Sequence, residues 1–479
     1  MRNTISTAGT AIAWALLLAG CSLAPPLETP EVPVAENYKE GGPWIAAQPA
    51  DHLPRGAWWQ LYAEPELDAL QDQLIANSPN LAAAVARYNQ AEAYTSQLRS
   101  GLFPIVDAVG SAERNRQSDR RPLRGTGSSD SDYSDYTVGV QAAYELDLWG
   151  RVRNTVAAGV ASAEAERADL ESTRLSLQAQ LAENYILLRG LDQQIALLQD
   201  MVEAFGKMLE LTQVRYEGGI APSLDVARAR TQYESARSRV EQALAQRAVA
   251  EHAIAALVGA SVSEFSITSR TDEIALPTIP VGVPSTLLQR RPDIAAAQRR
   301  MAAANASVGV ARAAYYPSLT LGAVFGFQSS TAGSLISAPA RFWAVGPSAI
   351  LTIFDYGRRR AQEAQAQALL EETGAQYRTV AINAFQQVED NLALINHYGK
   401  AANSQQAASD AAARALDFSM TRYREGASSY LDVTVSQTAV LEAQQDVVEL
   451  NTRKLQASVQ LIRALGGGWS ADQDADQSD

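Results

Sequence analysis

The sequence predicts a mainly α-helical chain that adds four strands to a transmembrane β-barrel and is built from two tandem repeats. Three observations predict this fold: a short motif that occurs twice, two long proline-free stretches rich in helix-forming residues, and four stretches in which apolar residues alternate with polar ones. The chain of 479 residues is 47% hydrophobic but only 7% aromatic, which favours long helices over a thick globular core. Its 53 acidic residues outnumber its 40 basic residues, which disfavours a general nucleic-acid binder.

The first residues have the features of a secretion signal that ends at the chain's only cysteine. Residues 1–20 contain an apolar run and end in Leu-Ala-Gly before Cys21. The stretch resembles a bacterial lipoprotein signal, in which the thiol of the new N-terminal cysteine carries lipid; an ordinary signal peptide is the alternative. Ser22, rather than Asp, follows the cysteine, which by the same resemblance points to the outer membrane. Residues 21–56 are rich in proline and are predicted to form an extended, lipid-anchored tether.

The body of the chain is a tandem duplication. Repeat 1 covers residues 57–275 and repeat 2 covers residues 276–469, and the small, acidic residues 470–479 are predicted to be disordered. Matching positions lie 213 residues apart at first, as in Pro79 and Pro292, and 207 residues apart from Val138 onward. Each repeat is therefore predicted to supply a helix, two strands and a long helical hairpin.

Each repeat contains two stretches that read as β-strands. Alternation of apolar and polar residues is clear in residues 136–146 and 318–328, and their less regular partners are 103–114 and 342–354. This pattern alone favours a globular sheet over membrane strands, but the signal and the lipid site reverse that preference.

Two long helices follow, at residues 151–216 and 358–423. The chain then turns at "RYEGGIAPSLDV" or "RYREGASSYLDV" and returns as a second helix that stops near Gly259 or Gly466. The motif is therefore the tip of a helical hairpin, in which Gly219 or Gly426 adopts the left-handed conformation that ends the outgoing helix.

An aspartate follows each tip glycine. Asp225 and Asp432 enter the first turn of the returning helix, where the helix dipole favours an anion. A role as helix-start residues and a role in gating both explain them.

Four strands per chain set the number of copies. The smallest membrane barrels have about eight strands, and open sheet edges are not tolerated in lipid. Three copies would supply twelve strands, and their hairpins would pool into a tube of helices. The counting predicts a hollow duct that carries lipid anchors.

The chain resembles the TolC-like outer-membrane efflux channels, in the lipoprotein branch often called the OprM or NodT group. The most specific stretch is "LPTIPVGVPSTLLQRRPDIAAAQRRMAAANASVGVARAAYYPSLTL", from Leu276 to Leu321, joined by "WWQLYAEPELDAL", "YELDLWGRVR" and "ALGGGW". The resemblance implies a homotrimer with a 12-stranded outer-membrane barrel and a 12-helix periplasmic tunnel. It also implies a periplasmic membrane-fusion adaptor and an inner-membrane, proton-driven transporter as partners, which makes the chain the passive exit duct for small molecules.

The resemblance assigns roles to residues of the tips. Tyr423 and Asp225 would hold the periplasmic aperture closed, and Asp432 would contribute a threefold acidic ring. This chain has Ser428 where TolC has an arginine of the latch, and Val435 where TolC has a second aperture aspartate.

The resemblance also makes the tips the place of adaptor contact. The tip residues expected to meet the adaptor are Tyr216, Gly219, Gly426 and Ser428.

The sequence contains no pattern that indicates catalysis or metal binding. His52, His252 and His397 are scattered without metal-ligand spacing, and there is no P-loop, dinucleotide fingerprint or Ser-His-Asp order. We therefore expect no enzyme activity and no cofactor other than the covalent lipid.

Two other functions remain as alternatives. A type I protein-secretion channel is disfavoured because the lipid site and "LLQRRPDI" belong to the pump branch. A lipid-anchored periplasmic coiled-coil adaptor or spacer would have a hairpin but no paired amphipathic strands.

Overall fold

The structure is a computed structural model whose described residues cover most of both repeats. They are 22–35, 38–40, 57–116, 118, 132–279 and 290–467. The predicted signal, Cys21, much of the tether, and the tail at 470–479 lie outside them.

The chain divides into two compact units, and each unit takes segments from both repeats. The sheet unit consists of Met1–Pro30, Arg87–Glu166 and Ala297–Tyr377. The hairpin unit consists of Glu31–Ala86, Arg167–Ala296 and Arg378–Asp479.

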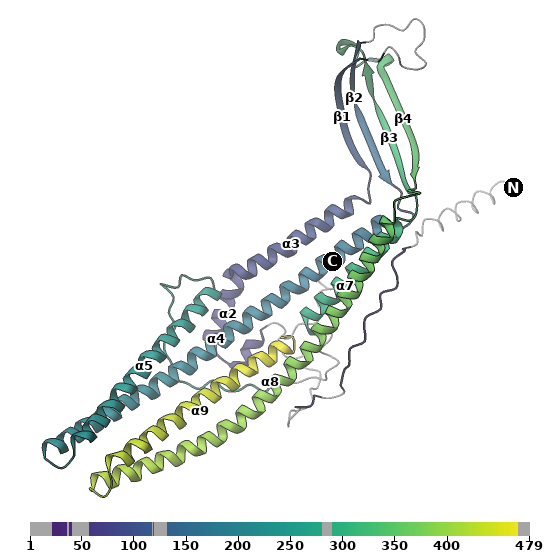
Figure 1. Ribbon diagram of the computed structural model, residues 1–479. Helices are drawn as coiled ribbons and strands as arrows, with labels where there is room; N and C mark the ends of the chain where they lie inside the picture. The colour runs from purple at the N-terminus through teal and green to yellow at the C-terminus, as the bar shows by residue number, and fades with distance from the viewer. Residues whose placement is uncertain are drawn as a thin grey trace. The chain divides into compact units, whose positions relative to one another are not determined.

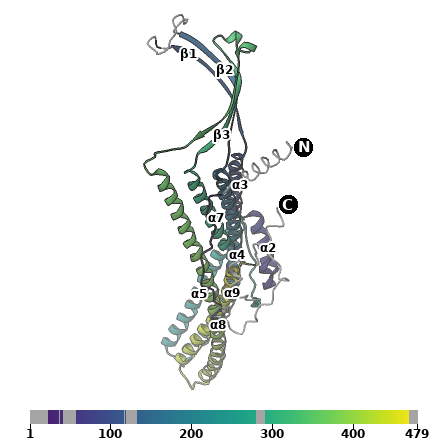
Figure 2. The same ribbon diagram turned by 90° about the vertical axis from the view of Figure 1, so that its right-hand side faces the viewer.

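The sheet unit contains one antiparallel sheet of four strands in the order β1-β2-β3-β4 (Figures 1 and 2). The strands are β1 (Ile105–Arg116), β2 (Asp132–Glu145), β3 (Ser318–Ser329) and β4 (Arg341–Ile350). The four predicted strands are confirmed, with shifted ends. Strand β4 stops at Ile350 rather than Phe354 because Ile350 pairs with Ser318, the first residue of β3, so the ladder has no further partner.

The register groups large apolar residues from the neighbouring strands on one face. Paired residues of antiparallel strands share a face. Val140 pairs with Ala108 on one side and with Phe325 on the other, and Phe325 pairs with Trp343. The opposite face of the sheet carries more polar residues. There, Thr137 pairs with Ser111 and with Gln328.

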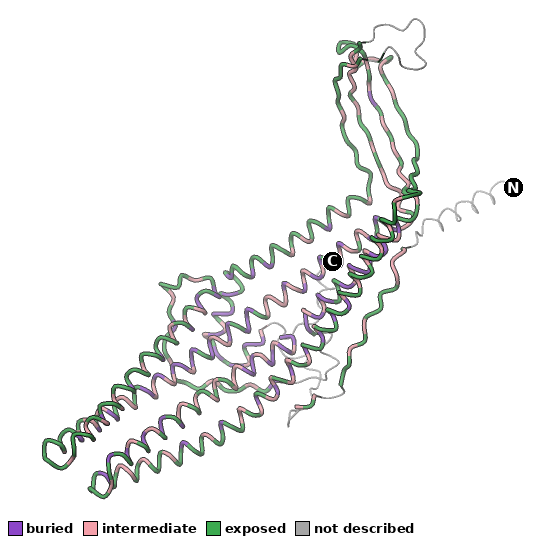
Figure 3. Tube along the Cα trace, viewed as in Figure 1, coloured by how far each residue is buried: buried purple, intermediate pink, exposed green. Residues whose placement is uncertain are grey.

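Apolar side chains on this face are not covered by other described elements. Phe325 and Trp343 are 46% and 69% exposed, and Figure 3 shows the strands almost entirely exposed or half-buried. An apolar face of this extent needs a partner other than water.

The hairpin unit is dominated by two helical hairpins of equal size. Helices α4 (Arg151–Glu217) and α8 (Arg358–Arg424) have 67 residues each and begin in the sheet unit, and the returning helices α5 (Ser223–Leu257) and α9 (Tyr430–Ala464) have 35 each. These bounds confirm the two predicted hairpins to within one or two residues.

A seven-residue repeat of alanine explains how α5 packs. Ala229, Ala236, Ala243 and Ala250 are all buried, and Leu257 continues the spacing. A period of seven keeps one stripe of an α-helix on the same side, and small residues there let the helices approach closely. Against this stripe α4 places a cluster of larger residues: Ile195, Leu198 and Phe205.

Shorter elements complete both units: among the described residues, a 3-10 helix and three α-helices precede the strands, and two 3-10 turns join β3 to β4. They are η1 (Trp58–Tyr62), α2 (Pro65–Asn77), α3 (Pro79–Ser100), α7 (Pro292–Ala313), η2 (Ala332–Ser334) and η3 (Ala338–Ala340). In the described part of the chain, no helix has both the length and the hydropathy to cross a membrane.

Both predicted helix stops are confirmed. Gly259 and Gly466 have φ values of +69° and +92°. A Cβ at Gly259 would lie 2.5 Å from the Asn77 carbonyl oxygen, and one at Gly466 would lie 2.3 Å from that of Arg290. The two contacts are equivalent in the duplication, so each hairpin ends against the residue two positions before α3 or α7.

Candidate functional site

The two hairpin tips have the same backbone turn. Gly219 and Gly426 have φ values of +74° and +77°, and a Cβ at either would meet no atom within 4 Å. Glycine is therefore needed for the left-handed conformation and not for space. The backbone N–H groups of Ile220 and Ala427 donate equivalent 2.8 Å hydrogen bonds to the carbonyls of Arg215 and Arg422.

The two tip aspartates have different surroundings. Asp432 Oδ2 accepts hydrogen bonds from both the backbone nitrogen and Oγ of Ser429, each at 3.2 Å, in a capping box that starts α9. Pro222 occupies the matching cap position before α5, and Asp225 lies 3.8 Å from Arg228 instead. Helix capping thus accounts for Asp432 without a second function, whereas Asp225 has no such cap.

Tyr423 is buried in the cluster that joins the two tips. It is 3% exposed and packs against Tyr430, with ring centroids 5.6 Å apart, and against Met208 and Ala229 of the other hairpin. Its hydroxyl makes no hydrogen bond within the described part of the chain, with Asp225 or with any other group.

Asp225 nevertheless acts on this cluster. Burial is the main reason that the pKa of Tyr430 is raised, and the charge of Asp225 adds to the increase. The charge of Asp225 therefore reaches the tyrosine cluster, and the role of Asp225 and Tyr423 in closing the aperture stays a prediction.

Arg215 is the tip residue that the sequence analysis did not single out. Its guanidinium carbon lies 4.6 Å from the centre of the Tyr423 ring, and its Nη1 donates a 3.0 Å hydrogen bond to the Tyr423 carbonyl oxygen. Arg215 lies in the last turn of α4 and Tyr423 in the last turn of α8, so this contact links the two hairpins. The matching Arg422 donates to Ala427 of its own turn at 3.3 Å. The sequence does offer one signal for this residue, because an arginine precedes the tyrosine in both tip motifs.

The other predicted tip residues lie near solvent-exposed apolar side chains. Tyr216 is 48% exposed beside Ile220 at 71% and Leu224 at 55%, and a shallow groove next to them follows α5. Ser428 has a buried Oγ that makes no hydrogen bond to any described residue.

A buried charge network lies farther along the hairpin unit. Asp192 is 1% exposed and accepts hydrogen bonds from Arg247 Nε at 2.6 Å, Arg189 Nη1 at 2.9 Å, Ser269 Oγ at 2.9 Å and the Arg270 backbone nitrogen at 3.2 Å. Its carboxylate is fully used in binding the 267–270 segment to α4 and α5, which indicates a structural role.

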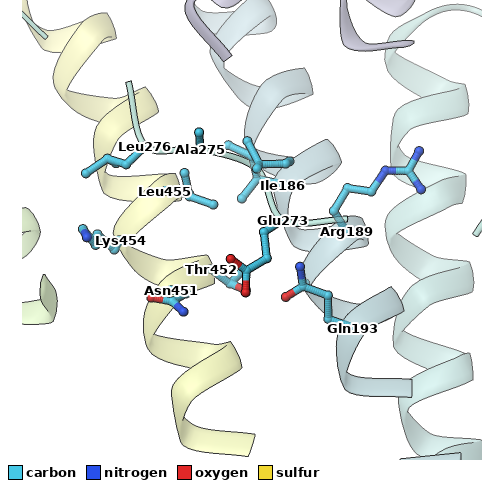
Figure 4. Close-up of a pocket in the computed structure, with 12 residues that line it drawn as sticks. Ile186, Arg189, Gln193, Glu273, Ala275, Leu276, Asn451, Thr452, Lys454 and Leu455 are labelled. Atoms are coloured by element: carbon cyan, nitrogen blue, oxygen red, sulfur yellow. The ribbon is translucent and has the colours of Figure 1, made fainter. Parts of the chain in front are cut away.

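A pocket of about 230 Å³ lies between α4, α9 and the segment 273–276 (Figure 4). The Glu273 carboxylate points toward Thr452 and Asn451 of α9, and Lys454 lies farther along the same helix (Figure 4). No group of three or more His, Cys, Asp or Glu residues suited to a metal ion occurs among the described residues.

Glu183 of α4 has a pKa that is raised to near neutrality. Burial raises its pKa to about 7, and the positive charge of Arg463 partly opposes the increase. Its carboxylate accepts a hydrogen bond from Gln460 Nε2 of α9. Its charge state therefore bears on the packing of α4 against α9.

Comparisons with known proteins agree over nearly the whole chain. The family model described as outer membrane efflux protein matches residues 70–260 and 283–467. The chain is 33% identical over 462 residues to the pyoverdine export outer membrane protein OpmQ of Pseudomonas aeruginosa, covering 95% of this chain and 96% of that protein. It is 32% identical over 459 residues to the toluene efflux pump outer membrane protein TtgC of Pseudomonas putida, covering 95% and 94%. The solved structure of the outer-membrane channel OprN matches with a TM-score of 0.86 at 29% identity, covering 94% of this chain and 100% of that one.

These matches confirm the predicted fold class, outer-membrane location and efflux function. They exclude the alternative of a periplasmic adaptor or spacer, and a passive channel family is not a family of enzymes. The chain belongs to the outer membrane efflux protein family.

Proposed function

We propose that three copies of this chain form the channel and that the pooled sheets close into one 12-stranded barrel. The supporting observation is the sheet itself: β1 and β4 are open edges, and one face of all four strands is apolar. Unpaired edge groups each cost several kcal/mol in lipid, so the edges must pair with those of other copies. The long hairpins would then combine into a 12-helix tunnel.

Single-particle imaging of the detergent-extracted protein tests this arrangement. A hollow ring with threefold symmetry is the expected view down the long axis. A monomer, or a ring with another symmetry, would contradict the pooled barrel.

The proposed cargo is small molecules that an adaptor and a proton-driven inner-membrane transporter deliver. OpmQ and TtgC are named for pyoverdine and toluene, which differ greatly in polarity and size. Relatives with such different cargo support a passive duct, with selection made upstream. In a strain that lacks its own efflux channels, the chain should restore resistance to small toxic compounds only when the cognate adaptor and transporter are present. Restored secretion of a protein substrate would instead favour a type I system.

We infer that the tips form the periplasmic aperture, lined by Asp432 and controlled by Asp225 and Tyr423. Asp432 is exposed in the first turn of α9, so three copies would place three carboxylates around the opening. Because Asp432 also caps the helix, Asp432→Asn is the sharper test than Asp432→Ala: asparagine keeps an acceptor for Ser429 but removes the charge. Divalent cations should block the current of the Asn variant less than that of the wild type. Equal block would leave Asp432 as a capping residue alone.

We propose the same tips as the adaptor contact. The exposed Tyr216, Ile220 and Leu224 support this, because apolar side chains at an exposed turn favour a protein partner. Ile220→Asp should reduce recovery of the channel with the adaptor, and Val249→Asp, at an equally exposed apolar site on α5, is the control.

The lipid on Cys21 is also a proposal. Its support is the Leu-Ala-Gly-Cys sequence after an apolar run. The intact mass of the mature protein should show cleavage before Cys21 and the added acyl groups, and Cys21→Ser should abolish palmitate labelling.

A further inference from the structure

The segment that follows Cys21 is seated in the sheet unit by specific contacts. The Ser22 hydroxyl donates a 2.9 Å hydrogen bond to Asn154 Oδ1, and Asn305 Nδ2 donates a 2.8 Å hydrogen bond to the Pro25 carbonyl oxygen. Pro30 approaches Gly374, where a Cβ would lie 3.4 Å from its ring. Residues 22–30 are therefore held against helices rather than forming a free tether.

Gly309 of α7 leaves the space that this seating needs. A Cβ there would lie 2.6 Å from Asn154 Nδ2, 2.8 Å from the Ala24 backbone nitrogen and 2.9 Å from the Ala24 Cβ. Contacts below 3.0 Å with backbone atoms are not tolerated without movement. Any other residue at position 309 would push the N-terminal segment away.

The duplication supports a role for these residues in holding the N-terminal segment rather than in the shared fold of the repeats. At the matching positions of the other repeat, Asn154, Asn305, Gly309 and Gly374 are replaced by Ala361, Glu92, Ser96 and Arg167. The same helices form in both repeats without these residues. These asparagines and glycines therefore occur only at the positions that meet residues 22–30, and the matching positions of the other repeat have other residues.

Asn154 has an unused donor at this place. The residue is 5% exposed, its Oδ1 is bonded to Ser22, and its buried Nδ2 makes no hydrogen bond within the described part of the chain. A buried amide donor without a partner is costly, on the order of 1–3 kcal/mol. An acceptor that belongs beside Ser22 would remove this cost.

We propose that Asn154 Nδ2 binds a carbonyl oxygen of the acylated Cys21, so that Asn154, Asn305 and Gly309 form the seat of the lipid anchor. This inference rests on the proposed lipidation. The modified residue adjoins Ser22 and carries amide and ester carbonyls, which are acceptors of the required kind. Asn154 lies in the first turn of α4, shortly after β2 ends at Glu145. The seat therefore brings the acyl chains out beside the foot of the membrane strands.

Hydrogen exchange of residues 22–30, measured on the full chain in lipid nanodiscs, tests the seat. Four proteins are compared: wild type and Asn154→Ala, each in lipidated form and in a form with Cys21→Ser and a non-lipoprotein signal. Asn154→Ala should speed exchange about fivefold more in the lipidated pair than in the unlipidated pair, the ratio expected for one lost hydrogen bond. Equal effects in the two pairs would overturn the proposal.

Gly309→Ala is the second variant, since its Cβ collides with Ala24 and should expose residues 22–30 in the lipidated protein. The matched controls are Asn391→Ala, whose amide bonds to Gln387 within α8, and Gly399→Ala, whose Cβ would have only ordinary contacts. Both should leave exchange unchanged, and a Gly309→Ala protein with unchanged exchange contradicts the seat.

Intact mass separates the two possible failures. A mature chain without acyl groups would refute the lipid anchor and this seat together. A lipidated chain that shows no coupling to Asn154 would refute the seat alone.

Discussion

The Arg215→Gln substitution should loosen the contact between the two hairpin tips of each chain. It removes the hydrogen bond from Nη1 to the Tyr423 carbonyl oxygen and the cation over the Tyr423 ring. A charged hydrogen bond and a partly exposed cation–π contact together stabilise such an arrangement by about 1–2 kcal/mol. If closing of the aperture depends on the two tips staying together, the ratio of open to closed channels should rise about 5- to 30-fold.

Single-channel recording in planar bilayers measures this ratio directly. Arg422→Gln is the matched control, because Arg422 occupies the same position of the second motif but donates to Ala427 of its own turn. Arg215→Lys separates charge from shape: lysine keeps the charge but lacks the planar fork that can stack on a ring while it donates to a carbonyl. The lysine variant should therefore lie between wild type and Arg215→Gln.

In cells, an aperture that opens more often should admit large antibiotics that the outer membrane normally excludes. Arg215→Gln should thus increase sensitivity to vancomycin, whereas Arg422→Gln should not. Unchanged open probability in Arg215→Gln, or an equal change in Arg422→Gln, would refute the argument that the contact between the hairpins keeps the aperture closed.

Three further substitutions test the fold and its charges. Gly426→Ala should destabilise the protein by about 1 kcal/mol in denaturant titrations because of its positive φ, and Gly399→Ala, in the interior of α8, should not. Asp192→Asn should cost about 3 kcal/mol, since it removes the buried negative charge that Arg189 and Arg247 share, while Glu234→Gln in an exposed pair should have little effect. The raised pKa of Glu183, about 7 against an ordinary 4.5, means that its contribution to stability is full below pH 4.5 and is lost as pH rises through 7. Glu183→Gln should remove that part of the pH dependence of unfolding, and an unchanged pH profile would show that Glu183 is not the responsible group.

The sequence predicted the backbone of this protein well because its signals are local. The turn at Gly219, the stop at Gly259 and the alternation in β3 each follow from residues a few positions apart. The alternation also predicts that Val140 and Phe325 share a face, but it does not fix the register, because a pairing shifted by two residues would keep the same face.

The contacts of the site depend on residues far apart in the chain, and local patterns do not show them. Arg215 and Tyr423 are 208 positions apart, and nothing in either motif states that the first arginine reaches the second tyrosine. Asp225 and Asp432 differ instead by a local feature that the sequence does show: Ser429, three residues before Asp432, completes a capping box, and Pro222 takes its place before Asp225.

Departures from the internal symmetry are the signal that sequence reasoning can use at such sites. Two copies of one unit share the constraints of the fold, so a position that differs between them is free of the common fold or has acquired a separate contact. The buried Asp192 binds the 267–270 segment, and repeat 2 has Gly399 in its place. Asn154 meets the N-terminal segment, and repeat 2 has alanine there. In both cases the differing residue is buried and polar, and its partner is a segment outside the repeated helices and strands. A buried polar residue in one repeat whose counterpart is small or apolar therefore marks a contact that the duplication itself does not require.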